Sequence, residues 1–390
     1  MTLEIRLTKN LRTAVMAGHP WLYRTAFERL PSAPAGSHVR ISDKHGFLAW
    51  GILDPEHSLA VRVMRTDQDL EPDLELIIQR LQVAQDLRRR VVPATVEAYR
   101  LVHGESDGLP GWAIDRYGDV LVVRTDGAAA IARLPLLVQA IQRCQLGEVR
   151  CLVHRRSRGD SEGASAEVVF GPSPEPRPYR EYGWQMDADV LLGQKTGWFI
   201  DQRENRKLIF EISRGLRVAN LFSYNGGFSL AAALGGAAQV TSVDISKPAI
   251  AAAQANFELN GLALSEYNFC AQDAFDWQAE AMVAGHSYDL MIIDPPSFAP
   301  NQRSVPNAER AYGRLFRNAA RLLAPGGLLA ASSCSSHIPM DHFRQIVSDA
   351  VRKEGRQLAI LHERGAGPDH PVLPAFPEGR YLKFTLGTLR

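Results

Sequence analysis

The chain has 390 residues, of which 45% are hydrophobic and 22% charged, and its formal net charge is +1 at pH 7. This length predicts two or three domains, and the composition excludes long disorder and fibrous folds. No apolar run reaches the roughly 18 residues of a membrane span, and the first residues lack the apolar core of a signal peptide. Four scattered cysteines predict neither a disulfide framework nor a zinc site. We therefore expect a cytoplasmic protein.

Arginine outnumbers lysine 37 to 7. Arginine is the better phosphate clamp and base-stacking cation, but codon bias in a GC-rich genome is the simpler explanation of the excess. A net charge near zero gives no general field that attracts a polyanion.

Residues 1–70 alternate polar and apolar side chains with a period of two, in short runs that glycines interrupt. Short alternating runs of this kind predict a small β-barrel, without a long amphipathic helix.

Residues 71–185 begin with a helical period, which predicts a helix over 71–92. Short strands are predicted next at 99–103, 111–115 and 120–124, then a helix over 129–144 and a strand over 147–154. The polar segment 155–180 is predicted to be a loop or hairpin, and residues 154–158 (HRRSR) form a basic patch that is typical of an exposed loop. This part reads as a middle α+β domain.

From residue 186 to 390 strands and helices alternate, which predicts a parallel sheet with helices on both faces. Strands are expected at 216–221, 239–243, 267–271, 288–293 and 327–332, and helices at 226–234, 248–260, 308–323 and 341–354. The predicted fold class is therefore α/β, with a Rossmann-like C-terminal domain after a β-barrel and an α+β domain.

Aspartates stand at or just beyond the ends of three successive predicted strands: Asp244, Asp273 and Asp294. Ligands of such sheets bind beyond the carboxyl ends of the strands, near the switch in strand order. A carboxylate after the second strand can accept both ribose hydroxyls, and Gly226 lets backbone approach the ligand. The bland alternative is that the aspartates cap the following helices.

The sequence contains no phosphate-binding P-loop and no metal-spaced cluster of histidine and cysteine. These absences favour an adenosine-bearing cofactor without a triphosphate. S-adenosylmethionine is the first candidate, and a nicotinamide dinucleotide is the second.

Longer motifs run through nearly the whole chain in order. The segments 220–228 and 294–298 (DPPSF), together with the strand that ends at Asp244, resemble class I S-adenosylmethionine-dependent methyltransferases. The segment 193–206 (GQKTGWFIDQRENR) is similar to the opening of the catalytic domain in bacterial large-subunit ribosomal RNA methyltransferases. Further matches to the 5-methylcytosine members, which carry an N-terminal PUA domain, lie at 18–21 (GHPW), 103–111 (HGESDGLPG), 369–371 (DHP) and 377–383 (PEGRYLK).

The resemblance implies that the partner is ribosomal RNA and that the cofactor is S-adenosylmethionine. A homodimer is compatible with the sequence. Implied cofactor contacts are Phe199, Arg203, Phe222, Ser223, Gly226, Asp244, Asp273 and Asp294. Implied RNA contacts are Lys195, Arg310 and Tyr312. No metal ligand is implied.

Cys334 follows the fifth predicted strand, within the run SSCSSH. Carbon 5 of cytosine is a poor nucleophile, and addition of a thiolate to carbon 6 makes it reactive. We therefore expect Cys334 to be the nucleophile and Asp294 to act at ring nitrogen 3. The bland alternative is that Cys334 is a buried small hydrophobe, as is expected for Cys144, Cys151 and Cys270.

Ser297 stands where many RNA cytosine methyltransferases have a second cysteine, so the group that removes the carbon 5 proton is not identified.

Two alternatives to this function stay open. A related family, which methylates the guanine amino group, shares the opening motif but lacks the strand-end cysteine. The protein could also be a non-catalytic RNA-binding protein with a Rossmann scaffold.

Arg310, with Arg314, Arg317 and Arg321, forms a basic helix face that suits contact with RNA or with solvent alone.

Overall fold

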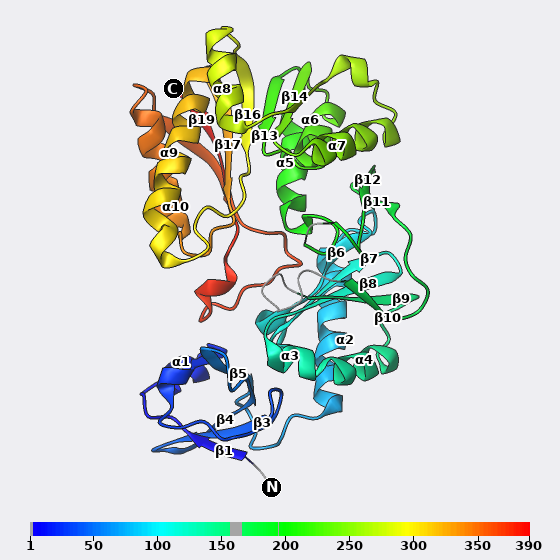
Figure 1. Ribbon diagram of the computed structural model, residues 1–390, viewed down its shortest axis with the longest axis vertical. Helices are drawn as coiled ribbons and strands as arrows, with labels where there is room; N and C mark the ends of the chain where they lie inside the picture. Colours follow the sequence, from blue (N-terminus) through cyan, green and yellow to red (C-terminus); the bar gives the residue numbers. More distant parts are fainter. Residues whose placement is uncertain (1–2, 157–165, 194) are drawn as a thin grey trace. The chain divides into compact units, whose positions relative to one another are not determined.

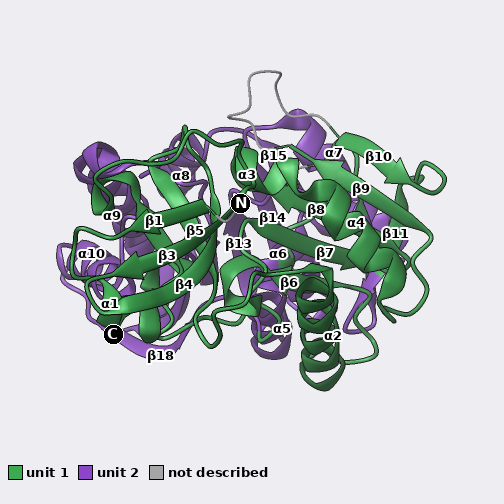
Figure 2. Ribbon diagram, turned by 90° about the horizontal axis from the view of Figure 1, so that it is seen from below, with its two compact units in different colours: residues 1–179, 188–200, 368–379 green, residues 180–187, 201–367, 380–390 purple. Residues whose placement is uncertain are grey.

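The computed structural model describes residues 3–156, 166–193 and 195–390, and the chain divides into two compact units (Figure 2). Unit 1 comprises residues 1–179, 188–200 and 368–379. Unit 2 comprises residues 180–187, 201–367 and 380–390. Each unit therefore includes segments that are distant in the sequence.

Unit 1 begins with a five-stranded sheet in the order β1-β3-β4-β5-β2, in which β1 and β3 are parallel and the other pairs antiparallel. Its strands are β1 (Leu3–Arg6), β2 (Trp21–Tyr23), β3 (His38–Asp43), β4 (Gly46–Leu53) and β5 (Leu59–Arg65). A short helix, α1 (Arg12–Met16), was not expected from the sequence, because five residues are too few to show a helical period. The alternating residues of the strands form a separate apolar core.

A second sheet in unit 1 has the order β10-β9-β8-β7-β6. Its strands are β6 (Ala98–His103), β7 (Trp112–Tyr117), β8 (Val120–Thr125), β9 (Cys151–Arg155) and β10 (Ala166–Phe170), and its helices are α2 (Leu74–Val91), α3 (Ala128–Ala132) and α4 (Leu134–Arg143). The single helix predicted over 129–144 is wrong: the chain forms two helices there. Pro135 lies in the first turn of α4, where a proline starts a helix rather than continuing one.

The hairpin of β11 (Arg177–Glu181) and β12 (Trp184–Ala188) lies in the sequence between β10 and the seven-stranded sheet of unit 2. Of the polar segment 155–180, which was predicted as a loop or hairpin, residues 166–170 form β10, antiparallel to β9, and residues 177–180 begin this hairpin.

Unit 2 is built on a seven-stranded sheet in the order β15-β14-β13-β16-β17-β19-β18 (Figure 1). The strands are β13 (Arg217–Leu221), β14 (Gln239–Asp244), β15 (Asn268–Ala271), β16 (Tyr288–Ile293), β17 (Leu323–Ser333), β18 (Leu358–Arg364) and β19 (Lys383–Leu389). The first five are parallel, as predicted. The sequence did not predict that β19 runs antiparallel to β17 and to β18.

Helices pack in two groups in unit 2. One group is α5 (Arg203–Ile212), α6 (Gly227–Leu234) and α7 (Lys247–Leu259), and the other is α8 (Ala274–Val283), α9 (Val305–Leu322) and α10 (Met340–Arg352). The second group covers an apolar core on its face of the sheet. This arrangement is the expected doubly wound α/β fold, with its switch in strand order between β13 and β16.

Candidate active site

The loops at the carboxyl ends of β13 and β16 leave the sheet at the same level. Leu221 and Ile293 are register partners, and the next residues along the chain are Phe222 and Asp294. Ile293 is in turn paired with Ala331 of β17, two residues before the strand ends. The sheet therefore brings the β13 turn, the Asp294 loop and the Cys334 loop to one edge, where ligands of this fold bind.

The turn after β13 is held in an unusual backbone conformation. Phe222 and Tyr224 have positive φ angles of 60° and 48°, which are rare for residues other than glycine. Gly226, also implied as a cofactor contact, has φ +79°, and a Cβ atom there would lie 2.8 Å from the Cβ of Ala253. Strain of this kind occurs at ligand-binding turns, but the sequence motif alone did not reveal it.

Ser223 lies inside this turn and is 6% exposed. Its N–H donates to the carbonyl of Val243 at 2.9 Å, whereas its buried Oγ has no hydrogen-bond partner among the described residues. A buried hydroxyl is normally paired, so this oxygen suits a polar group of a bound ligand. The turn therefore fits the expected cofactor.

Asp244 is the last residue of β14, and both of its carboxylate oxygens are held by backbone. The N–H of Tyr224 donates to Oδ2 and the N–H of Ser246 donates to Oδ1, each at 2.9 Å. The helix cap of α7 is Ser246, so Asp244 does not serve as that cap. The carboxylate is instead fixed against the β13 turn, where ribose hydroxyls can donate to it.

Asp273 has the structural role that was considered as the alternative. Its side chain caps α8 by accepting from the N–H groups of Phe275 and Asp276. Its position after β15 still agrees with the prediction, and its contact with an adenine stays a prediction.

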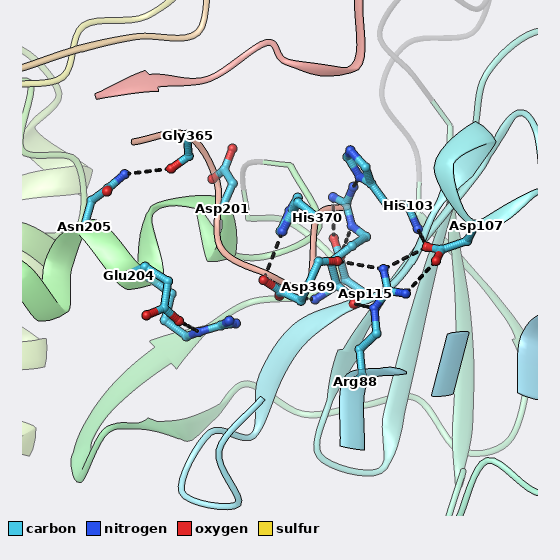
Figure 3. Close-up of polar contacts among 12 residues, drawn as sticks. Arg88, His103, Asp107, Asp115, Asp201, Glu204, Asn205, Gly365, Asp369 and His370 are labelled. Carbon is cyan, nitrogen blue, oxygen red and sulfur yellow. Dashed lines mark hydrogen bonds and ion pairs between the residues drawn. The ribbon is translucent and has the colours of Figure 1, made fainter. Parts of the chain in front are cut away.

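Gln202, near the start of segment 201–367 of unit 2, is hydrogen-bonded to Asp294. Sequence reasoning missed this residue. Gln202 Nε2 donates to Asp294 Oδ2 at 3.0 Å and to Ser332 Oγ at 2.8 Å. Its Oε1 accepts from Asn205 Nδ2 at 2.6 Å, and Asn205 also donates to the carbonyl of Gly365 (Figure 3). The amide of Gln202 is thereby oriented so that it donates to both Asp294 and Ser332. Its place in the DQREN motif was the only available signal.

Cys334 lies directly after β17 and is neither fully buried nor fully exposed. The residues beside it are anchored: Ser335 Oγ accepts from the N–H of Ala299 and lies 3.2 Å from the hydroxyl of Ser297. The loop that carries Asp294 is thus tied to the loop that carries Cys334. Ser297 belongs to that link.

Tyr312 is not placed as the sequence suggested. It was expected to contact RNA, but it is fully buried, and its hydroxyl donates to Ser333 Oγ at 2.9 Å and lies 3.2 Å from Ser335 Oγ. Burial raises the pKa of its phenol, and the charges of Cys334 and Asp294 add to this rise. Tyr312 therefore supports the Cys334 loop and presents no surface to RNA.

The basic face of α9 is largely engaged within the protein. Arg314 stacks over Phe275, with its guanidinium carbon 3.7 Å from the ring centre, and Arg317 and Arg321 pair with Glu354. Arg310 is exposed and donates to Asn307, so it remains the RNA-contact candidate of this helix.

The other implied contacts lie in different surroundings. Arg203 is fully buried in unit 2 and pairs with Glu204 at 3.2 Å. Lys195 and Phe199 lie in unit 1, where the Lys195 ammonium is 4.2 Å from the Phe199 ring centre. Their contacts with cofactor or RNA stay predictions. Of the basic patch 154–158, residues 157 and 158 lie outside the described part of the chain.

Of the three other cysteines, Cys151 is buried as expected, whereas Cys144 and Cys270 are only half-buried. Burial raises the pKa of the Cys144, Cys151 and Cys270 thiols. A raised pKa leaves less thiolate at neutral pH, so none of the three is suited to act as a nucleophile.

Two motifs of the sequence meet in unit 1. The side chain of Arg88 binds the carboxylate of Asp107, from the motif at 103–111, and the carbonyl of Asp369, from the motif at 369–371 (Figure 3). The rings of His103 and His370 lie 5.0 Å apart, centre to centre. This polar cluster explains why both segments carry charged residues, since it fixes the C-terminal segment on the second sheet.

Within the described residues no group of histidine, cysteine and carboxylate side chains could hold a metal ion. Over the same part of the chain, no helix is long and apolar enough to cross a membrane.

Comparison with known proteins agrees with this geometry. Residues 138–375 match the family of S-adenosylmethionine-dependent methyltransferases, and residues 5–66 match a PUA-like domain. A Streptococcus mutans protein described as a SAM-dependent methyltransferase has the same fold, with a TM-score of 0.87 at 24% identity over 99% of this chain and 100% of that one. A methyltransferase structure in complex with S-adenosylhomocysteine gives a TM-score of 0.89 at 24% identity over the same shares. The chain therefore belongs to the S-adenosylmethionine-dependent methyltransferases and has their fold.

Two curated relatives are more similar in sequence. Ribosomal RNA large subunit methyltransferase I of Serratia proteamaculans is 37% identical over 392 residues, which cover 98% of each chain. The protein of the same name from Erwinia tasmaniensis is 36% identical over the same share. The chain therefore belongs to the ribosomal RNA large subunit methyltransferase I family.

Proposed function

We propose that this protein methylates carbon 5 of a cytosine in large-subunit ribosomal RNA, through a transient covalent bond between Cys334 and the base. The observation that carries the proposal is the presence of Cys334 and Asp294 on adjoining strand ends, in loops linked through Ser297 and Ser335. The names of the relatives support ribosomal RNA as the substrate. Its place of action is the cytoplasm.

The cofactor site would be formed by the strained β13 turn and by Asp244. The unpaired Ser223 Oγ and the Asp244 carboxylate provide acceptors for hydroxyl or amino groups of the ligand, and Gly226 leaves room for close backbone approach. Bound S-adenosylmethionine supplies the methyl group that the activated carbon 5 accepts.

The protein's own residues would act on the cytosine ring. The Cys334 thiolate adds to carbon 6, and electron density moves to carbon 5 and to nitrogen 3, where Asp294 in its protonated form donates a hydrogen bond that stabilises the adduct. Gln202 holds the Asp294 carboxyl in place for this contact. After the methyl group is attached, a base takes the carbon 5 proton, and the ring regains its double bond as the thiolate leaves. A buried site requires that the cytosine be unstacked or flipped from the RNA.

The test is to identify the modified nucleoside. Ribosomal RNA that lacks this modification is incubated with the protein and S-adenosylmethionine, then digested to nucleosides and analysed by mass spectrometry. The proposal predicts 5-methylcytidine, which Cys334→Ala abolishes and Cys270→Ala leaves unchanged. N2-methylguanosine would instead support the guanine alternative, and no product with intact RNA binding would support a non-catalytic RNA-binding protein.

A further inference from the structure

Lys383 is a buried lysine beside the Cys334 loop. It is the first residue of β19 and the register partner of Ser333, the residue before Cys334. It is only 2% exposed. Lysine is almost never buried to this degree without a partner for its charge. The position therefore calls for an explanation that goes beyond packing.

The Lys383 ammonium is held by carbonyl groups on both sides. Nζ donates to the carbonyl of Ser335 at 2.5 Å and to that of Tyr381 at 2.7 Å. Ser335 is the residue after Cys334, so the ammonium is hydrogen-bonded to the peptide segment that carries the thiol. Across the described part of the chain, no carboxylate forms an ion pair with Lys383. A buried cation without a counter-ion is costly unless another group benefits from its charge.

The electrostatic surroundings point to the thiol as that group. Burial lowers the pKa of Lys383 to about 8, and the charge of Cys334 acts in the opposite direction by raising it. The lysine therefore remains a cation at neutral pH, and the interaction with Cys334 favours the charged form of both groups.

Three other described groups near the Cys334 loop bring no positive charge to it. Asp294, after β16, is an acid and brings none. Tyr312, from α9, is neutral at physiological pH because burial raises the pKa of its phenol. Gln202 has no charge. Lys383, from β19, is the group among these whose positive charge favours the thiolate.

We propose that Lys383 is a positioning residue that holds Cys334 in its thiolate form and fixes the loop around it. This inference rests on the proposed function, since it explains how Cys334 becomes a nucleophile at neutral pH. The thiol proton is lost to solvent, and Lys383 keeps its own three protons, so no proton needs to pass between the two groups. A nearby lysine commonly lowers the pKa of a reactive cysteine in this way.

The test measures how fast Cys334 reacts with iodoacetamide between pH 5 and pH 10, without RNA. Peptide mass spectrometry follows all four cysteines in the same sample. In the wild-type protein, the midpoint of the rate profile should be lower for Cys334 than for Cys144, Cys151 and Cys270. In Lys383→Met, the Cys334 midpoint should rise by about one pH unit, so that alkylation at pH 7 slows about tenfold. Lys383→Arg keeps the charge and should keep the midpoint near the wild-type value.

The matched control is Lys207→Met, which removes a solvent-exposed lysine from α5 and should leave the profile unchanged. A purely structural role would lower the Tm or the S-adenosylmethionine affinity of Lys383→Met without moving the Cys334 midpoint, and this result would overturn the proposal. If neither Lys383 variant folds, a wild-type Cys334 midpoint no lower than that of Cys270 overturns it as well.

The result of this alkylation test can be distinguished from the result of the nucleoside test of the proposed function. A shifted midpoint in a protein that makes no 5-methylcytidine would leave the role of Lys383 standing and reject the cytosine reaction. Formation of 5-methylcytidine with an unmoved midpoint would do the reverse.

Discussion

Asp244 is held by the turn that follows β13, and we propose that its carboxylate accepts further hydrogen bonds from the ribose of the cofactor. Its two oxygens accept from the backbone N–H groups of Tyr224 and Ser246. A carboxylate held in this way is already oriented, so it loses little entropy when ribose hydroxyls donate to it. The contribution of this residue should therefore appear in the affinity for S-adenosylmethionine.

We expect Asp244→Ala to weaken S-adenosylmethionine binding by about 1–3 kcal/mol, because charge-assisted hydrogen bonds are lost. Isothermal titration calorimetry measures this change. The control is Asp289→Ala, which removes an aspartate at the opposite end of the sheet, where it pairs with Arg217. Equal affinities in wild type and a folded Asp244→Ala would show that the ribose is held elsewhere.

Some residues of the candidate site could be predicted from the sequence, and others could not. Asp244, Asp294 and Cys334 follow strands whose apolar runs are distinct in the sequence, so their common edge could be foreseen. Gln202 could not, because its role depends on Asn205 and on Ser332, 130 residues away. Tyr312 was expected to contact RNA because it is near Asp294 and matches the family locally, although the helical period places it opposite the arginines, on the face of α9 that is buried.

At the scale of elements, the hairpin β11–β12 is attached to α5 by a buried ion pair. Arg206 donates to both oxygens of Glu181, at 2.7 and 2.5 Å, and the two side chains are 3% and 4% exposed. Breaking a buried pair leaves one charge without compensation, which typically costs about 3–5 kcal/mol.

We therefore expect Arg206→Met to lower the free energy of unfolding by about 3–5 kcal/mol, as measured by urea denaturation. Adding Glu181→Leu to this variant should restore most of the loss, because the unpaired carboxylate is then removed as well. Lys207→Met, which breaks an exposed pair with Glu211 on the same helix, should change stability by less than about 1 kcal/mol. A double variant as unstable as the single one would contradict this account of the pair.

The five parallel strands were predictable, because each is a short apolar run followed by a helix. The antiparallel β18 and β19 were not, since a strand's direction in a sheet depends on its neighbours rather than on its own period. For the same reason the sequence did not single out Lys383, because its position beside the Cys334 loop depends on the pairing of β19 with β17.

At the scale of the whole molecule, the PUA-like domain provides a second place at which RNA could bind. A cavity of about 220 Å³ in this domain is lined by residues that include Lys9, Trp21 and Tyr23. Tyr23 is 45% exposed, which is unusual for a large aromatic side chain. An exposed ring beside a lysine suits the stacking of a base and the binding of its phosphate.

We expect Tyr23→Ala to weaken ribosomal RNA binding by about 1–3 kcal/mol, the typical value of one stacked base, and to leave S-adenosylmethionine affinity unchanged. Filter binding at several salt concentrations measures the effect. Leu70→Ala, at another exposed apolar residue, is the control. RNA affinity that is the same in wild type and Tyr23→Ala would exclude this ring from the RNA surface.

We propose that Cys334 forms a covalent bond with cytosine during methyl transfer, and this bond can be trapped. The protein is incubated with S-adenosylmethionine and ribosomal RNA that contains 5-fluorocytosine, because fluorine cannot leave as the proton does. We expect a protein–RNA adduct that maps to Cys334, is absent in Cys334→Ala and forms normally in Cys270→Ala. Methylation of unmodified RNA by Cys334→Ala at a near-normal rate, with no adduct in the wild-type protein, would contradict it.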